Sequence, residues 1–142
     1  MPGIGTLAIL PIPPETDPNM QNYKLVLPEN LNHYGYLFGG YMLQWVDEVA
    51  WIAATMDFPG CRFVTIGMDN VEFRESILEG TILRFDVNKS RVGNTSVSYL
   101  VEVAKDSREN GSAFSTTVTM VRVNKDGVKT PLTAPADEPQ PT

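Results

Sequence analysis

The stretch NHYGYLFGGYMLQWVDEVAWIAATM, residues 32–56, decides how the rest of this chain can fold. Its first part is a glycine-containing loop, and residues 41–56 after it are apolar at nearly every position. A helix that is apolar on nearly every face belongs inside a fold or inside a membrane. This one is too short to span a bilayer and carries two carboxylates, Asp47 and Glu48. We therefore expect the buried central helix of a globular domain.

A polar stripe runs along this predicted helix. Gly40, Gln44, Asp47 and Trp51 recur at spacings of four, three and four residues, which puts them on one face. An unpaired carboxylate on an apolar helix is costly, and residues 25–61 contain no Lys or Arg that would pair with it locally. A carboxylate in that setting is a candidate base or nucleophile.

The start of the helix offers a complementary group. Gly39 and Gly40 leave the N–H groups of the first turn accessible to an anionic oxygen. Asp47 lies about two turns, or ~10 Å, along the axis from Gly40, and its side chain leans back toward the N-terminus. Both can contact one acyl group, which makes the stretch a candidate active site.

Composition excludes several classes of protein. Cys61 is the only cysteine and His33 the only histidine, which excludes an internal disulfide, a Cys-rich zinc site and a His-cluster metal site. The sequence has neither a G-x-S-x-G nucleophile elbow nor a phosphate-binding Walker loop. A net charge of −6 argues against a general nucleic-acid-binding protein.

The length of 142 residues indicates one domain with a sizeable core. Residues 1–19 are predicted to be a Pro-rich N-terminal arm, residues 20–130 the single domain, and residues 131–142 a C-terminal tail. No apolar run reaches transmembrane length, and no basic leader precedes an apolar core. We therefore expect a cytoplasmic protein that does not bind membranes.

Five segments have the composition and alternation of β-strands. They are residues 23–27, 62–73, 81–92, 95–104 and 112–124. The order of strand, long apolar helix and four antiparallel strands predicts an α+β fold in which one sheet wraps around one helix. Because such a sheet has open edges, we expect two chains to pair edge to edge as a homodimer.

The spacing of residues in the central stretch resembles that of the hotdog-fold acyl-CoA thioesterases. The resemblance rests on Asn32-x-x-Gly35-x-x-x-Gly39-Gly40 followed by Asp47-Glu48-Val49-Ala50. It extends through VTIGMDNVEFRESILEG, residues 64–80, and through residues 92–96. The most similar group contains the bacterial broad-range and the animal cytosolic long-chain acyl-CoA hydrolases. The resemblance implies a hotdog fold, in which an antiparallel sheet wraps around one long central helix.

The resemblance also implies catalytic roles. Asp47 matches the helix aspartate that acts as nucleophile or as general base toward water. Asn32 matches the loop asparagine that orients the thioester or the attacking water from the neighbouring subunit. Gly39 and Gly40 match the glycines whose N–H groups polarise the thioester carbonyl, and a developing oxyanion does need preorganised donors. Neither a metal nor another cofactor is implied, because CoA is part of the substrate.

The CoA site is less well marked. Its candidates for phosphate contacts are Arg74, Lys89 and Arg91, at the matching strand ends and hairpin. Asn94 and Ser96 would add polar contacts there.

The loop departs from the family at Tyr34 and Tyr36, which occupy positions that are often small or polar in relatives. Two tyrosines beside the thioester would narrow or reshape the acyl pocket. The length of the acyl chain therefore stays open.

Three functions are compatible with the sequence. The leading expectation is a homo-oligomeric acyl-CoA thioester hydrolase that releases a free carboxylic acid and CoA, with active sites at the subunit interface. One alternative is a hotdog hydratase or dehydratase, although such enzymes usually have a histidine beside the carboxylate and His33 lies off the helix. The other is a non-catalytic acyl-CoA or acyl-carrier binding module. Such a module would keep the pocket but lack hydrolytic turnover. Asp47 taken by itself is also compatible with a structural carboxylate at the dimer interface.

Overall fold

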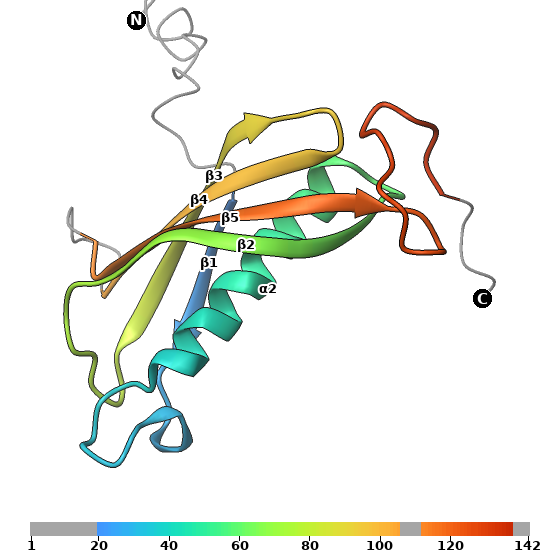
Figure 1. Cartoon of the computed structure of the whole chain (residues 1–142). Helices are drawn as coiled ribbons and strands as arrows, with labels where there is room; N and C mark the ends of the chain where they lie inside the picture. The colour runs from blue at the N-terminus through green and yellow to red at the C-terminus, as the bar shows by residue number, and fades with distance from the viewer. Residues whose placement is uncertain (1–19, 106–111, 138–142) are drawn as a thin grey trace, which may run out of the picture.

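One antiparallel sheet with a long helix against one of its faces makes up the part of the chain that the structure describes (Figure 1). The structure, a computed structural model, describes residues 20–105 and 112–137. In sheet order the strands are β1 (Met20–Leu25), β3 (Ile82–Val92), β4 (Ser96–Ala104), β5 (Phe114–Val123) and β2 (Arg62–Phe73). The helices are η2 (Pro28–Asn30), a 3-10 turn, and α2 (Gly39–Asp57). β1 and β2 are therefore the edge strands.

The predicted α+β class and the predicted order of elements are confirmed. The strand expected at residues 62–73 has these bounds, and those expected after it differ by one or two residues at their ends. The first strand begins earlier than residue 23, because Met20 already pairs with Val87 of β3. The predicted arm, residues 1–19, lies outside the described residues, as do residues 138–142 of the predicted tail.

α2 buries one stripe rather than its whole circumference, which corrects the expectation of a helix buried on all sides. The buried side chains recur at helical spacing: Met42, Trp45, Val46, Val49, Ala50, Ala53 and Ala54. On the opposite side Gln44 and Glu48 are exposed, and the Trp51 side chain is 46% exposed. A helix that lies on one face of a single sheet keeps an outward stripe, and no described residue covers it.

The inner face of the sheet supplies the other half of the core. Alternate residues of two strands are buried, as their patterns predict: Leu83, Phe85 and Val87 of β3, and Val97, Tyr99, Val101 and Val103 of β4. Trp45 packs edge-on against Phe85, with ring centroids 6.4 Å apart. This packing fixes the position of α2 on the sheet, and with it the direction of the polar side chains along the helix.

Arg122 of β5 binds the segment that follows the last strand, although its side chain is only 1% exposed. Its guanidinium donates hydrogen bonds to three backbone carbonyls, those of Pro131 at 3.0 Å, Ala134 at 2.8 Å and Pro135 at 2.5 Å. The N–H of Asp137 donates to the carbonyl of Gly60 at 2.8 Å. Residues 131–137 therefore pack on the domain. The division of the chain at residues 19 and 130 stays a prediction.

Candidate active site

Asp47 is half-buried on α2 and faces the edge strand β2. Its Oδ1 accepts a hydrogen bond from the Thr65 hydroxyl, and the same hydroxyl lies 3.3 Å from the sulfur of Met120. Among the described residues no Lys or Arg forms an ion pair with Asp47, whereas Lys24 of β1 lies 3.2 Å from Glu48. The local sequence offers neither carboxylate a cation, and β1 brings Lys24 to Glu48 from a distant part of the sequence.

Thr65 was not singled out from the sequence. In the pattern of residues 62–73 it reads as an ordinary β-branched strand residue. Its position beside Asp47 comes from the packing of β2 against α2, next to a register shift between Thr65 and Gly67 in the ladder with β5. Such bulges re-aim neighbouring side chains and are frequent beside functional sites. No sequence signal marked this contact.

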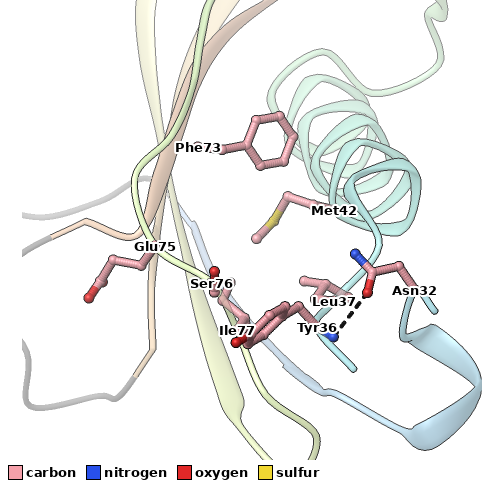
Figure 2. A pocket seen from close by; sticks show the side chains of 8 residues that line it. All are labelled: Asn32, Tyr36, Leu37, Met42, Phe73, Glu75, Ser76 and Ile77. Carbon is pink, nitrogen blue, oxygen red and sulfur yellow. Dashed lines mark hydrogen bonds between the residues drawn. The ribbon is translucent and has the colours of Figure 1, made fainter. Parts of the chain in front are cut away.

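Asn32 organises the loop before α2. Its Oδ1 accepts hydrogen bonds from the N–H groups of Tyr34 at 2.9 Å and Tyr36 at 3.1 Å. Among the described residues its side-chain NH₂ has no acceptor, and Figure 2 shows that group on the side of the loop that faces Met42. The oxygen therefore holds the turn, while the nitrogen remains able to donate to another group.

The helix begins with two unpaired donors. The first N–H that bonds the N-cap carbonyl of Phe38 is that of Tyr41, at 3.0 Å, so the N–H groups of Gly39 and Gly40 have no acceptor among the described residues. A Cβ at Gly40 would lie 2.7 Å from the Phe38 ring, and one at Gly39 would lie 3.4 Å from the Phe73 ring. A Cβ at Gly40 would therefore clash with the Phe38 ring, whereas one at Gly39 would make an ordinary contact with Phe73.

A pocket of about 210 Å³ opens beside the start of the helix (Figure 2). Its lining combines apolar side chains with a polar rim: Asn32, Tyr36, Leu37, Met42, Phe73, Glu75, Ser76 and Ile77. Asp47 is not among these residues. Within one chain the structure therefore brings Asn32 to the end of α2 where Gly39 and Gly40 begin it, and keeps Asp47 farther along the helix.

The predicted CoA-binding residues fall into two groups. Lys89 and Arg91 lie near the end of β3, and Asn94 and Ser96 lie in the hairpin to β4. Arg74 follows β2 at the opposite end of the sheet, because Phe73 pairs with Phe114 whereas Ser96 pairs with Val121 of the same strand. The structure does not bring Arg74 together with the other four within one chain.

The three basic side chains differ in what they contact. Lys89 lies 3.5 Å from Asp57, and Arg74 lies 2.6 Å from Glu72. Arg91 is exposed and forms no ion pair with any described residue. It is therefore the one of the three whose charge is not already matched by a carboxylate.

Two classes of feature are not found in the described part of the chain. No group of three or more His, Cys, Asp or Glu side chains is arranged to hold a metal ion. No described helix is long and apolar enough to cross a membrane.

Comparison with known families gives a match over residues 34–112, which covers the loop, α2 and most of the sheet. The matching model is that of the thioesterase superfamily. This chain belongs to that superfamily. The matched range contains Gly39, Gly40 and Asp47, whereas Asn32 lies just before it.

Two curated relatives are longer than this chain. Protein VdlD of Helicobacter pylori is 33% identical over 119 residues, which are 82% of this chain and 66% of VdlD. The uncharacterised acyl-CoA thioester hydrolase YkhA of Bacillus subtilis is 29% identical over 112 residues, 75% of this chain and 63% of YkhA. The chain thus spans just under two thirds of the length of both relatives.

Solved structures agree on the architecture. A hexameric hotdog-fold thioesterase of Campylobacter jejuni has a TM-score of 0.68 at 36% identity, over 81% of this chain and 89% of that one. The acyl-CoA hydrolase of Staphylococcus aureus, solved with butyryl-CoA and CoA, has a TM-score of 0.70 at 28% identity, over 79% of this chain and 67% of that one. The chain has the hotdog fold, which confirms the fold that the resemblance implied.

Proposed function

We propose that this chain hydrolyses acyl-CoA thioesters to a free carboxylic acid and CoA. The observation that carries the proposal is Asp47, a half-buried carboxylate that lacks a cation among the described residues and is held by the Thr65 hydroxyl. The unpaired N–H groups of Gly39 and Gly40, at the start of α2, supply the electrophilic half of such a site. An acceptor of protons and a set of preorganised donors are the groups that acyl transfer to water requires.

The proposed chemistry follows from these groups. The N–H groups of Gly39 and Gly40 receive the thioester oxygen and stabilise the negative charge that develops on it. Asp47 either removes a proton from water, which then attacks the carbonyl carbon, or attacks that carbon itself to form a mixed anhydride that water then hydrolyses to the free acid. The C–S bond breaks, and the CoA sulfur leaves as a thiolate that takes up a proton. Asn32 orients the thioester or the water through its unpaired NH₂.

We further propose that each site is shared between two subunits of a homo-oligomer. Within one chain Asp47 does not reach the pocket that Asn32 lines. The edge strand β2 carries exposed apolar side chains beside Thr65, at Val64 (44%) and Ile66 (58%). An unpaired apolar edge of this kind is a surface on which a second copy pairs. The Campylobacter jejuni relative is hexameric, so dimers that assemble further are compatible with this arrangement.

The Staphylococcus aureus hydrolase supports the choice of residues. It has been studied as alanine variants at an asparagine, an aspartate and a threonine. Its asparagine and aspartate stand fifteen residues apart, as Asn32 and Asp47 do, and its threonine follows the aspartate by seventeen residues. Thr65 follows Asp47 by eighteen. We therefore assign Thr65 to the site as the residue that positions the carboxylate.

The remaining assignments are proposals as well. CoA phosphates would contact the hairpin that holds Arg91, Asn94 and Ser96, with Lys89 beside it. Arg74 would contact the same CoA molecule only if this arginine belonged to a different chain from the hairpin. We expect hydrolysis to need neither a metal nor a bound cofactor, and we expect the protein to be cytoplasmic.

A thiol-release assay with acyl-CoA substrates tests the function. Stoichiometric release of CoA and free acid by the purified protein, with first-order dependence on its concentration, is the expected result. Binding of acyl-CoA without release would instead identify a binding module. Loss of an enoyl or hydroxyacyl substrate without thiol release would identify a hydratase or dehydratase.

A further inference from the structure

We propose that Arg122 and the segment it binds hold the hairpin between β3 and β4 in the shape that receives CoA. The segment is residues 131–137, which follow β5 and are called the strap below. The inference rests on the proposed function, because it takes Arg91, Asn94 and Ser96 of the hairpin as contacts for CoA phosphates. Arg122 does not touch the ligand in this arrangement. It is a positioning residue that acts through the strap.

Main-chain hydrogen bonds join the hairpin to β5 and to the strap. After β5 the chain reverses and returns beside that strand, where the N–H of Thr130 donates to the carbonyl of Arg122 at 2.9 Å. The N–H of Arg122 donates to the carbonyl of Thr95 at 2.8 Å, and the N–H of Leu132 donates to the carbonyl of Asn94 at 2.8 Å. Figure 1 shows the returning segment next to the turn between β3 and β4. The backbone of the turn is therefore held by two neighbouring segments.

One buried side chain sets the path of the strap. The guanidinium of Arg122 donates to the carbonyls of Pro131, Ala134 and Pro135. Two of these carbonyls belong to prolines, which have a fixed φ and no N–H that would need a partner of its own. Leu132 lies between them in sequence, is 7% exposed and joins the hydrophobic core. Arg122 therefore controls the part of the strap from which the Leu132 N–H reaches the hairpin.

The cost of burying Arg122 indicates that it fixes a geometry rather than adds stability. Among the residues that the structure describes, Asp137 is the one carboxylate that pairs with it, at 3.4 Å, and the Asp137 side chain is 30% exposed. The Nε of Arg122 is buried and has no acceptor in the same part of the chain. A buried charge with a distant counter-ion and an unsatisfied donor gains little net free energy. Buried polar groups of this kind select one conformation in some proteins.

The hairpin needs outside support because its own ladder is interrupted. The pairing of β3 with β4 shifts register between Lys89 and Arg91, and a bulge leaves one residue unpaired and bends its strand. Within the turn, the N–H of Gly93 donates to the carbonyl of Ser96 at 2.7 Å. The bond from the strap to Asn94 restrains the turn from outside the hairpin. Groups that are held in their bound positions beforehand bind a ligand more tightly, since less freedom is lost on binding.

Calorimetry with CoA and steady-state hydrolysis of one acyl-CoA test the positioning role. Arg122→Met keeps the length of the side chain but removes its donors. It should weaken CoA binding by about tenfold, the loss expected when one charge-assisted hydrogen bond is no longer held in place. The KM should rise by a similar factor, with kcat per folded protein nearly unchanged, because the contact is equal in ground and transition states. Arg122→Lys keeps the charge and three donors and should recover part of the affinity.

Hydrogen exchange locates the change, and a core variant controls for stability. In Arg122→Met the amides of residues 91–97 should exchange faster, whereas those in the middle of α2 should not. Val103→Ala shortens a fully buried side chain at the end of β4 that lies away from the hairpin, so it lowers stability without altering the strap. Its Kd for CoA should equal that of the wild-type protein. If Val103→Ala weakens CoA binding as much as Arg122→Met does, stability explains the effect and the inference fails.

A second variant keeps the test valid if Arg122→Met does not fold. Leu132→Ala weakens the attachment of the strap to the core and leaves the buried charge in place, and it should raise the Kd for CoA severalfold. Folded Leu132→Ala protein with the wild-type Kd and wild-type exchange at residues 91–97 overturns the inference, as the same result for Arg122→Met does. If these variants weaken CoA binding but the wild-type protein releases no thiol from acyl-CoA, the strap assignment stands and the proposed function fails.

Discussion

Asp47 is the residue on which the proposed chemistry depends most. Asp47→Asn keeps the size and one acceptor oxygen of the side chain but removes the base, so kcat should fall by about 10²-fold or more. The KM should change little, because asparagine keeps the shape of the side chain and the lost base acts in the transition state rather than in binding. Thiol release under saturating acyl-CoA measures the effect.

The neighbouring carboxylate provides the control for Asp47. Glu48 is exposed and paired with Lys24, and an ion pair of this kind contributes little to stability. Glu48→Gln should therefore keep both fold and turnover. An Asp47→Asn protein with near wild-type kcat would remove Asp47 from the mechanism.

Thr65 acts through Asp47 rather than on the substrate. Thr65→Val keeps the shape of the side chain but removes the hydroxyl that donates to Oδ1 of Asp47. We expect kcat to fall by roughly tenfold with KM nearly unchanged, because a misplaced catalytic group affects the transition state more than binding. Thr65→Ser should restore most of the rate. A serine variant as slow as the valine variant would show that the methyl group, and not the hydroxyl, matters.

At the scale of elements, the end of α2 is joined to β4 by one buried hydrogen bond. Tyr99 has no exposed surface, and its hydroxyl donates to Oδ2 of Asp57 at 2.7 Å. Burial holds the pKa of the Tyr99 hydroxyl well above its usual range, and the bond to the Asp57 carboxylate raises that pKa further. Lys89 lies 3.5 Å from the same oxygen of Asp57. The junction therefore needs a protonated tyrosine.

This raised pKa predicts a loss of stability in alkali. Because the folded-state pKa exceeds the unfolded value of about 10, the stabilisation is fully present below about pH 10 and decreases above it. Above about pH 10 the free energy of unfolding should fall in both proteins. It should fall more steeply in the wild-type protein than in Tyr99→Phe, by about 1.4 kcal/mol for each pH unit. Urea unfolding of both proteins between pH 8 and 11 measures the difference, and parallel curves would contradict the assignment.

The hairpin between β3 and β4 presents the proposed phosphate contacts. A register shift between Lys89 and Arg91 interrupts the ladder with β4 at this point, and such a bulge changes the direction of nearby side chains. Arg91→Ala should raise KM for acyl-CoA severalfold with kcat nearly unchanged, and should weaken the salt dependence of KM. Lys125→Ala, an exposed charge after β5, is the control. An unchanged KM in Arg91→Ala would move the CoA site away from this hairpin.

At the scale of the whole molecule, the shared site has a quantitative test. If Asn32 and Asp47 of one site come from different chains, a mixed dimer of Asn32→Ala and Asp47→Ala chains has one doubly damaged site and one intact site. Equal amounts refolded together form about half mixed dimers, and so restore roughly a quarter of the wild-type sites. If dimers assemble further into a hexamer, each dimer keeps its own two sites, so the expected fraction of intact sites is the same.

The activity of the co-refolded sample is compared with the mean activity of the separately refolded Asn32→Ala and Asp47→Ala proteins. Native mass spectrometry on chains of different mass provides the control that subunits have exchanged. Activity no higher than that mean, with exchange demonstrated, would mean that both residues act within one chain.

Much of the fold follows from local patterns. The alternation of residues 81–92 and 95–104 determined which side chains of β3 and β4 are buried, because a strand places successive side chains on opposite faces. The length and hydrophobicity of residues 41–56 determined that a long helix forms. The spacing from Asn32 to Asp47 marked the candidate site, because glycines, an amide and a carboxylate in that order match a known catalytic pattern.

Three features were decided only by the tertiary structure. Thr65 reaches Asp47 because β2 packs against α2, and Lys24 reaches Glu48 because β1 lies beside β3; both contacts join residues that are distant in sequence. The helix has an exposed stripe because only one sheet face covers it, which hydrophobicity alone does not reveal. Local sequence sets which groups a segment offers, and the packing of distant segments sets which of those groups meet.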